Sequence, residues 1–172
     1  MKTADLLHDR DSLEHAIVRM GKQIDAQLGD ETALFLPVMN GALIFSAALA
    51  LAISHDLEFD YVHATRYRGT TTGSKLHWIN QPQTSMQGRT VILVDDILDE
   101  GHTLSAIRDY CVEHGARKIL IAVLCEKRHG RTVAGIAADF VGLEVPDRYV
   151  FGFGMDYHEQ GRNLPGIYAL QE

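Results

Sequence analysis

The sequence predicts an α/β fold in which helices flank a mainly parallel, twisted sheet. Short, continuous apolar runs recur along the chain, and such runs are typical of strands that are buried on both faces. Segments with helical periodicity alternate with these runs, which favours helices packed against the faces of a parallel sheet. The apolar runs cover residues 33–38, 91–94 and 118–125.

Length and charge set the broad class of the protein. A chain of 172 residues is most simply one domain, and it is long enough to bury a core without disulfides or metals. Its formal net charge of -7 argues against nucleic acid or an anionic membrane as the default partner. The longest apolar run, residues 41–53, is too short to span a bilayer, and the acidic first residues are unlike a signal peptide. We therefore expect one cytoplasmic domain, residues 1–172.

The cysteine and histidine residues point to neither disulfides nor zinc. Cys111 and Cys125 form no CxxC pair and lie among apolar residues, so we expect reduced, buried thiols. The nine histidines include no HxxxH or HExxH spacing, which argues against a zinc site.

The N-terminal part predicts a helix, a strand and a second helix. Asp11 and Glu14 have capping-box spacing, and apolar residues follow at helical intervals up to Gly29. A buried strand over residues 33–38 then leads through a tight turn into a buried helix over residues 42–53. This order is the beginning of a βαβ unit.

The middle of the chain has the least regular pattern. Residues 58–67 alternate like a strand, but residues 68–88 are rich in Thr, Gly, Ser, Gln and Asn and have few apolar anchors. A stretch of this length without secondary structure is often functional, so residues 67–88 are a candidate mobile lid. A β-hairpin or a plain surface excursion is the alternative interpretation.

The C-terminal part predicts one helix among several strands. The helix covers residues 103–115, with its apolar side chains inward and a glycine as its stop. Ligands of parallel sheets bind at the carboxyl ends of the strands, and Asp95 and Asp96 lie at such an end. The predicted strands are residues 91–94, 118–125, 139–145 and 148–154.

Four carboxylates follow the buried strand at residues 91–94, in the sequence VILVDDILDEGHT. Thr103 or Glu100 could cap the next helix, so capping does not explain the adjacent Asp95 and Asp96. Two adjacent carboxylates repel each other, and keeping both ionised requires a cation or hydroxyl donors. A sugar phosphate that carries Mg²⁺ supplies both.

The glycine-containing turn after these acids suits an anion. Free amides and the positive end of the helix dipole meet where such a turn opens a helix. The rival phosphate motifs GxxxxGK[ST] and GxGxxG after a strand are missing. Acids beside a phosphate turn therefore indicate a phosphorylated sugar as the ligand.

Residues 91–103 resemble the phosphoribosyl-pyrophosphate-binding signature of type I phosphoribosyltransferases. The shared features are the apolar strand, the acid pair and the acid-x-Gly-x-Thr turn. Residues 124–128, residues 139–157 and Arg162 resemble the C-terminal half of hypoxanthine-guanine phosphoribosyltransferases, and residues 39–41 match their pyrophosphate loop more loosely. The resemblance covers most of the chain.

This resemblance implies the type I phosphoribosyltransferase fold, with a small hood built from the N-terminal and C-terminal segments. It also implies transfer of a phosphoribosyl group from phosphoribosyl pyrophosphate to the 6-oxopurines hypoxanthine or guanine, with Mg²⁺, in a homodimer or homotetramer. The alternatives are a preference for xanthine or another base, or a regulator that binds nucleotides without turnover. Because the chain is acidic and keeps Asp99 and Lys127, the regulator is disfavoured.

The resemblance assigns roles to the acids. Asp95 and Asp96 contact the ribose hydroxyls and the metal, and Asp156 is a further metal-binding acid. Asp99 is the general base that takes the N7 proton of the purine. Positioned proton transfer of this kind increases the reaction rate by a factor of about 10²–10⁴.

Further contacts to the substrates follow from the same resemblance. Lys127 donates to the purine O6, Tyr149 stacks on the ring, and Val150 reads its edge through the main chain. Asn40, Gly41 and Arg162 contact pyrophosphate. The 5′-phosphate lies in the turn of Asp99, Glu100, Gly101, His102 and Thr103. Tyr67 and Arg148 complete the implied substrate-binding residues.

Overall fold

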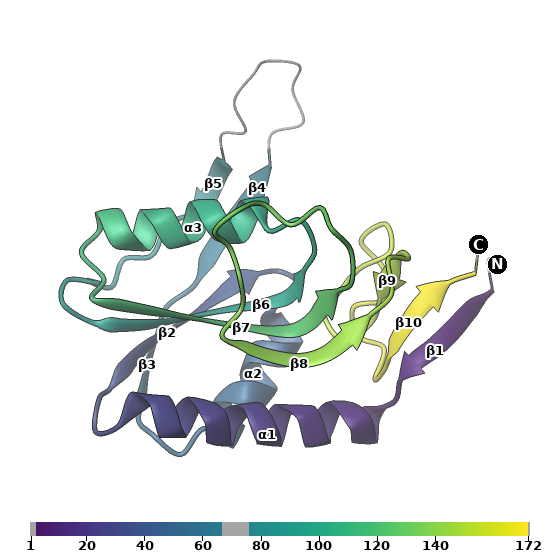
Figure 1. Cartoon of the computed structure of the whole chain (residues 1–172), viewed down its shortest axis with the longest axis horizontal. Coiled ribbons are helices and arrows are strands. Elements are labelled where there is room, and N and C mark those ends of the chain that lie inside the picture. Colours follow the sequence, from purple (N-terminus) through teal and green to yellow (C-terminus); the bar gives the residue numbers. More distant parts are fainter. Residues whose placement is uncertain (1–2, 67–75, 172) are drawn as a thin grey trace.

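The structure, a computed structural model, describes residues 3–66 and 76–171 (Figure 1). Its helices are α1 (Arg10–Leu28), α2 (Leu43–Ala52) and α3 (His102–Glu113). Its strands are β1 (Ala4–His8), β2 (Ala33–Met39), β3 (Leu57–Phe59), β4 (Val62–Arg66), β5 (Leu76–Asn80), β6 (Thr90–Leu98), β7 (Lys118–Lys127), β8 (Phe140–Val145), β9 (Val150–Phe151) and β10 (Ile167–Leu170).

The larger sheet is mainly parallel and lies between two layers of helices. Its order is β5-β4-β2-β6-β7-β8, with β3 paired to β2, and only β5 runs antiparallel to its neighbour. Helices α1 and α2 cover one face and α3 covers the other (Figure 1). Alternate residues of β6 serve the two cores, since Ile92 and Val94 pack with α1 and α2 while Val91 and Leu93 pack with α3. The predicted α/β fold is confirmed.

A second, smaller sheet joins the two ends of the chain. Strand β10 lies between β1 and β9, and both pairings are antiparallel (Figure 1). The Arg148 guanidinium ties this sheet together by donating to Asp5 at 2.7 Å and to the carbonyl of Leu170. This sheet is the expected hood. Strand β9 is shorter than the predicted strand at residues 148–154, because Gly152 adopts a positive φ of 100°.

Both predicted helix caps differ from those in the structure. Helix α1 is capped by Asp9, whose carboxylate accepts the Ser12 amide at 2.9 Å, so the prediction of Asp11 was wrong. Helix α3 has Gly101 at its N-cap and no side-chain cap, so neither Thr103 nor Glu100 has that role. The apolar stripe of α1 and its end at Gly29 are as predicted.

The predicted strand at residues 58–67 is divided into β3 and β4 by Asp60. The Asp60 carboxylate accepts the amides of Tyr61, Gln83 and Thr84 at 2.7–2.8 Å and holds a bend between the two strands. Alternation along the sequence continues across Asp60, and for this reason the break was not predicted.

The candidate lid is regular over part of its length. Strand β5 pairs with β4 as a hairpin, which was the alternative interpretation, and Trp78 packs on Tyr110 of α3 with 4.7 Å between ring centroids. The prediction of a segment without regular structure is therefore wrong for residues 76–80. Residues 67–75, with Tyr67, lie outside the described residues.

Cys111 and Cys125 are buried and unpaired, as predicted. Burial raises the pKa of the Cys111 thiol to about 11. No helix in the described ranges is long and apolar enough to cross a membrane.

His55 links the end of α1 to the loop after α2. Its Nδ1 lies 2.7 Å from an oxygen of Asp25, and its Nε2 contacts the carbonyl oxygen of Gly29. Both partners only accept hydrogen bonds, so both ring nitrogens donate only when the imidazole is protonated. The hydrogen bond with Asp25 is the main reason that the pKa of His55 is raised.

We predict that His55→Gln lowers stability in a pH-dependent manner. A raised folded-state pKa adds stability that is complete below the unfolded value of about 6.5 and is lost as the pH rises through the folded-state pKa. Urea unfolding between pH 5 and pH 9 should show a deficit at pH 5 that shrinks toward pH 9. His15→Gln, on the exposed face of α1, controls for the loss of a surface histidine. A deficit that does not change with pH would contradict the charged link.

Candidate active site

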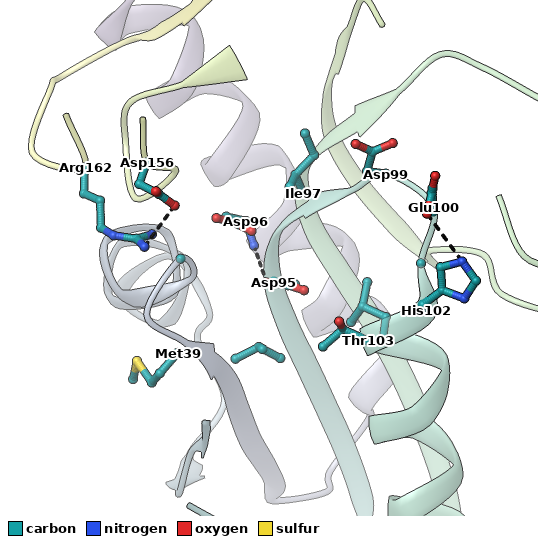
Figure 2. Close-up of a pocket in the computed structure, with 14 residues that line it drawn as sticks. Met39, Asp95, Asp96, Ile97, Asp99, Glu100, His102, Thr103, Asp156 and Arg162 are labelled. Carbon is teal, nitrogen blue, oxygen red and sulfur yellow. Dashed lines mark hydrogen bonds and ion pairs between the residues drawn. The ribbon is translucent and has the colours of Figure 1, made fainter. Parts of the chain in front are cut away.

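Two adjoining cavities lie where β2, β6 and β7 end. The first has a volume of about 390 Å³ and is bordered by the ends of β2 and β6 and by the start of α3 (Figure 2). The second, of about 190 Å³, lies toward β7 and β9. Both are lined by Asp96, Ile97, Asp99 and Asp156. One acidic wall therefore serves two spaces.

Asp95 and Asp96 face the first cavity from the end of β6. The strand continues to Leu98, further than predicted, because its pairing with β7 extends to Glu126. Burial and the charge of Asp96 raise the pKa of Asp95 well above its ordinary value. Burial also raises the pKa of Asp96, although a hydrogen bond with Asp95 and the Arg162 cation oppose it. A cation or hydroxyl donors in the cavity would therefore favour the ionised form of the pair.

The loop after β2 approaches the acid pair so closely that it requires glycine. A Cβ on Gly41 would lie 2.0 Å from an Asp96 oxygen, and one on Gly154 would lie 2.1 Å from the Gly41 carbonyl oxygen. The backbone of Gly41 thus lies against the Asp96 side chain, and the backbone of Gly154 packs on that of Gly41. Gly154 and this stacking were not found from the sequence, because the second segment comes from far along the chain.

The turn between β6 and α3 forms another side of the first cavity. Glu100, Gly101, His102 and Thr103 line it, and the N-terminus of α3 opens toward it. The helix start, which no side chain caps, presents backbone amides and a partial positive charge, a suitable site for phosphate. His102 lies 3.4 Å from Glu100 and so pairs within the turn (Figure 2).

Asp156 and Arg162 face the acid pair from the segment after β9 (Figure 2). Arg162 forms an ion pair with Asp156 at 2.9 Å and donates to the Gly154 carbonyl at 2.8 Å. One guanidinium therefore positions the third carboxylate and the backbone that covers Gly41.

The second cavity has the features of a site for a flat polar ring. Lys127, Tyr149, Val150 and Met155 line it, and the half-exposed Tyr149 donates through its hydroxyl to the Asp156 carbonyl at 3.1 Å. The Lys127 ammonium lies 2.7 Å from Oδ2 of Asp99. A charged donor, a carboxylate and an aromatic face therefore meet in one small space.

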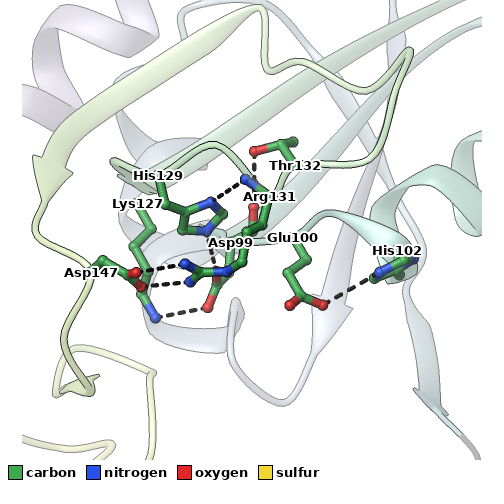
Figure 3. Close-up of polar contacts among 8 residues, drawn as sticks. All are labelled: Asp99, Glu100, His102, Lys127, His129, Arg131, Thr132 and Asp147. Carbon is green, nitrogen blue, oxygen red and sulfur yellow. Dashed lines mark hydrogen bonds and ion pairs between the residues drawn. The ribbon is translucent and has the colours of Figure 1, made fainter.

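His129 is a further site residue that could not be found from the sequence. No motif in the sequence marks the segment after Lys127, but the His129 side chain is only 3% exposed and its Nε2 lies 2.5 Å from Oδ1 of Asp99 (Figure 3). Burial raises the pKa of Asp99, but the hydrogen bonds from Lys127 and His129 outweigh it, so this pKa is lowered overall. No spacing pattern connects His129 with Asp99 in the sequence.

Of the predicted site residues that the structure describes, Asn40 and Arg148 are not brought to the cavities. Asn40 is exposed and is absent from the described lining of both spaces. The Arg148 guanidinium is engaged in the hood with Asp5 and Leu170 instead. Tyr67 lies outside the described residues.

The donor set suits a hard cation that shares its ligands with a substrate. Asp95, Asp96 and Asp156 offer only oxygen atoms to the first cavity. Across residues 3–66 and 76–171, no three His, Cys, Asp or Glu side chains gather closely enough to hold a metal ion by themselves. Mg²⁺ fits such a site, because it prefers oxygen and usually keeps water and substrate phosphates among its ligands.

The chain is similar to known proteins over nearly its whole length. Residues 3–160 match the family model of the phosphoribosyl transferase domain. The hypoxanthine-guanine phosphoribosyltransferase of Bacillus subtilis is 36% identical over 167 residues, which are 96% of this chain and 92% of that protein. The Streptococcus pyogenes protein of the same name is 33% identical over 168 residues, 97% of this chain and 93% of the relative.

Solved structures have the same fold. A hypoxanthine-guanine phosphoribosyltransferase from Bacillus anthracis gives a TM-score of 0.93 at 28% identity and covers 99% of this chain and 100% of its own. A hypoxanthine phosphoribosyltransferase from Staphylococcus aureus gives a TM-score of 0.91 at 27% identity, with 97% and 91% covered.

We predict that Asp95→Asn stabilises the ligand-free protein at neutral pH. The folded-state pKa of Asp95 is raised, so its contribution to stability falls as the pH rises from the unfolded value of about 3.9 through the folded-state pKa. Asparagine cannot ionise, and we expect a gain in Tm of roughly 2–4 °C, corresponding to about 1 kcal/mol in a domain of this size.

Thermal unfolding at pH 4 and pH 7.5 measures this effect. The gain should be larger at pH 7.5, because the cost of the buried wild-type carboxyl grows as the pH rises above the unfolded value of about 3.9. Asp56→Asn, in the exposed loop after α2, removes a carboxylate without this environment and should give no gain. If Asp95→Asn is no more stable than Asp56→Asn at pH 7.5, burial and the neighbouring Asp96 do not destabilise the protein through Asp95, and the inference is wrong.

Proposed function

The chain belongs to the phosphoribosyltransferase family, and from this premise we propose that it is a purine-salvage enzyme. It transfers the phosphoribosyl group of phosphoribosyl pyrophosphate to hypoxanthine or guanine, giving IMP or GMP and pyrophosphate. The observation that carries this proposal is the acidic wall of Asp96, Asp99 and Asp156 shared by the two cavities. A sugar phosphate in the larger space and a base in the smaller would meet at that wall.

The larger cavity receives phosphoribosyl pyrophosphate in this proposal. The amides at the start of α3 and the Thr103 hydroxyl bind the 5′-phosphate, while Asp95 and Asp96 bind the ribose hydroxyls. The backbone at Gly41 and the Arg162 guanidinium bind pyrophosphate. The positive helix end and Arg162 support these assignments, because they oppose each other across the cavity that the acids line.

Mg²⁺ is the metal that this proposal requires. Asp95, Asp96 and Asp156 would hold it together with water and substrate oxygens. When bound, it neutralises charge on the pyrophosphate leaving group.

The smaller cavity receives the purine. Lys127 donates to O6, Tyr149 stacks on the ring, and the main chain at Val150 reads the edge. Their common position along this cavity supports the assignment. The preference for a 6-oxo group follows from the ammonium, which only donates hydrogen bonds.

Asp99 is the general base. As the bond from C1′ to the pyrophosphate oxygen breaks, a bond forms from C1′ to N9, and the N7 proton passes to the Asp99 carboxylate. In the free protein the Lys127 ammonium lies 2.7 Å from Oδ2 of Asp99. This contact lowers the pKa of Asp99 and makes it a weaker base. When Lys127 turns toward O6, Asp99 becomes more basic at the moment when a proton is present.

An assay with Mg²⁺, phosphoribosyl pyrophosphate and each of hypoxanthine, guanine, xanthine and adenine tests the function. We expect turnover of hypoxanthine and guanine and none of adenine. A marked preference for xanthine would favour the alternative substrate, and nucleotide binding without any turnover would favour a regulator. Absence of turnover with every 6-oxopurine would refute the proposal.

We predict that Asp99→Asn slows the chemical step by about tenfold or more, because positioned proton transfer is lost. Single-turnover measurements with guanine isolate this step, and titration with GMP should show nearly unchanged binding. Asp109→Asn, on the exposed side of α3, is the matched control and should react like the wild type. An unchanged single-turnover rate in Asp99→Asn would rule out Asp99 as the base.

We also infer that the chain forms a homodimer or homotetramer. Leu43, Phe59 and Tyr61 are exposed apolar residues that border an apolar cavity of about 470 Å³ on the far side of β2 from α3. Exposed apolar patches of this kind often become subunit interfaces. Light scattering of the purified protein measures the assembly directly.

The buried, unpaired thiols of Cys111 and Cys125 support a reducing compartment, and we infer a cytoplasmic location. Fractionation of cells that express the protein would show it in the cytoplasmic fraction, whereas recovery in another compartment would contradict the inference.

A further inference from the structure

The segment that follows β7 is fastened to the turn that carries Asp99. His129 binds the Asp99 carboxylate, and the Thr132 hydroxyl lies 3.4 Å from the Asp99 carbonyl oxygen (Figure 3). The Val133 amide donates to the Glu100 carbonyl at 2.9 Å. Three successive contacts therefore join the two loops. This segment, which no sequence motif marks, therefore supports the turn that carries Asp99.

The surroundings of His129 determine which ring nitrogen carries the proton. The backbone amide of Arg131 donates to Nδ1 at 3.0 Å, so Nδ1 is an acceptor and carries no hydrogen. The proton of the neutral ring is therefore on Nε2, which donates to Oδ1 of Asp99 at 2.5 Å. Because the side chain is only 3% exposed, water does not compete for either nitrogen.

The loop itself is held by an ion pair with two hydrogen bonds. The Arg131 guanidinium donates to both oxygens of Asp147, each at 2.8 Å (Figure 3). Such fork-shaped pairs fix orientation as well as distance. Asp147 precedes β9, the strand that brings Val150 to the smaller cavity, so the wall of that cavity and the His129 loop are held together.

Lys127 and His129 each bind one oxygen of the Asp99 carboxylate. Lys127 holds Oδ2 through a flexible side chain with three donors, and in the proposed function it must also serve the purine. His129 holds Oδ1 through one donor on a buried ring. Of these two described partners, His129 is therefore the one that can keep the carboxylate oriented while Lys127 turns away.

We propose that His129 is a positioning residue that fixes the Asp99 carboxylate through Oδ1 and leaves Oδ2 to receive the purine proton. The inference rests on the proposed function, because it assigns His129 a part in that reaction. It adds a residue that acts through Asp99 and touches no substrate.

The test compares His129→Phe, which keeps a ring without a donor, with His129→Gln, whose amide can still donate. We expect His129→Phe to lower the single-turnover rate with guanine by about tenfold, within the range of positioned proton transfer, while the Kd for GMP stays within about threefold. His129→Gln should recover most of the rate. The exposed Arg128, next in the chain to His129, provides Arg128→Ala as a control with wild-type activity. A wild-type rate in His129→Phe would overturn the proposal.

A double variant separates positioning from general structural support. In an Asp99→Asn background, His129→Phe should cause no further loss, because there is no base left to position. An equal further loss would show that His129 acts independently of Asp99 and would overturn the proposal. Thermal unfolding of each variant confirms that the comparison is made between folded proteins.

Nitrogen-15 spectra of the ligand-free wild type provide a measurement that needs neither turnover nor a variant. The neutral Nε2–H tautomer of His129 is expected, and an Nδ1–H tautomer would overturn the assignment. Failure of the proposed function would appear separately, as a wild-type protein that turns over no 6-oxopurine.

Discussion

The structure depends on the placing of two adjacent carboxylates, Asp95 and Asp96, at the end of a strand whose preceding residues are fully buried. Repulsion and burial disfavour the ionised pair, so a rigid frame must hold the two groups together and a compensating charge favours their ionised form. The apolar part of β6, locked between β2 and β7, supplies the rigidity. Gly41 and Gly154 remove side chains that would fill the space, and Arg162 brings positive charge to its border.

Much of the larger sheet could be predicted, because its strands and helices carry local signals. Apolar runs identify β2, β6 and β7, and a helical stripe identifies α1. Two of the hood strands, β1 and β10, could not be found in this way. Strands β1 and β10 are only five and four residues long, and their pairing joins the two ends of the chain. The break at Asp60 also depends on amides more than twenty residues away.

The site could be predicted where its residues follow one another in the sequence. The acid pair, Asp99 and the turn into α3 form one continuous motif, and the pairing of Leu98 with Glu126 brings Lys127 to Asp99. His129 could not be predicted, because its role depends on how a loop folds back after β7. Arg148 presents the converse case. A position expected to bind substrate is engaged in holding the hood.

The central position of β10 in the hood has a consequence for the order in which the molecule is built. During synthesis, the carboxylates and the phosphate turn leave the ribosome well before β10 does. The strand that carries Val150 into the smaller cavity has only β10 as its partner in the described sheet. A nascent chain could thus form the sugar-phosphate side of the site while the wall for the base is still unsupported. Emergence of Ile167–Leu170 then joins the first strand of the chain to the wall of the base cavity.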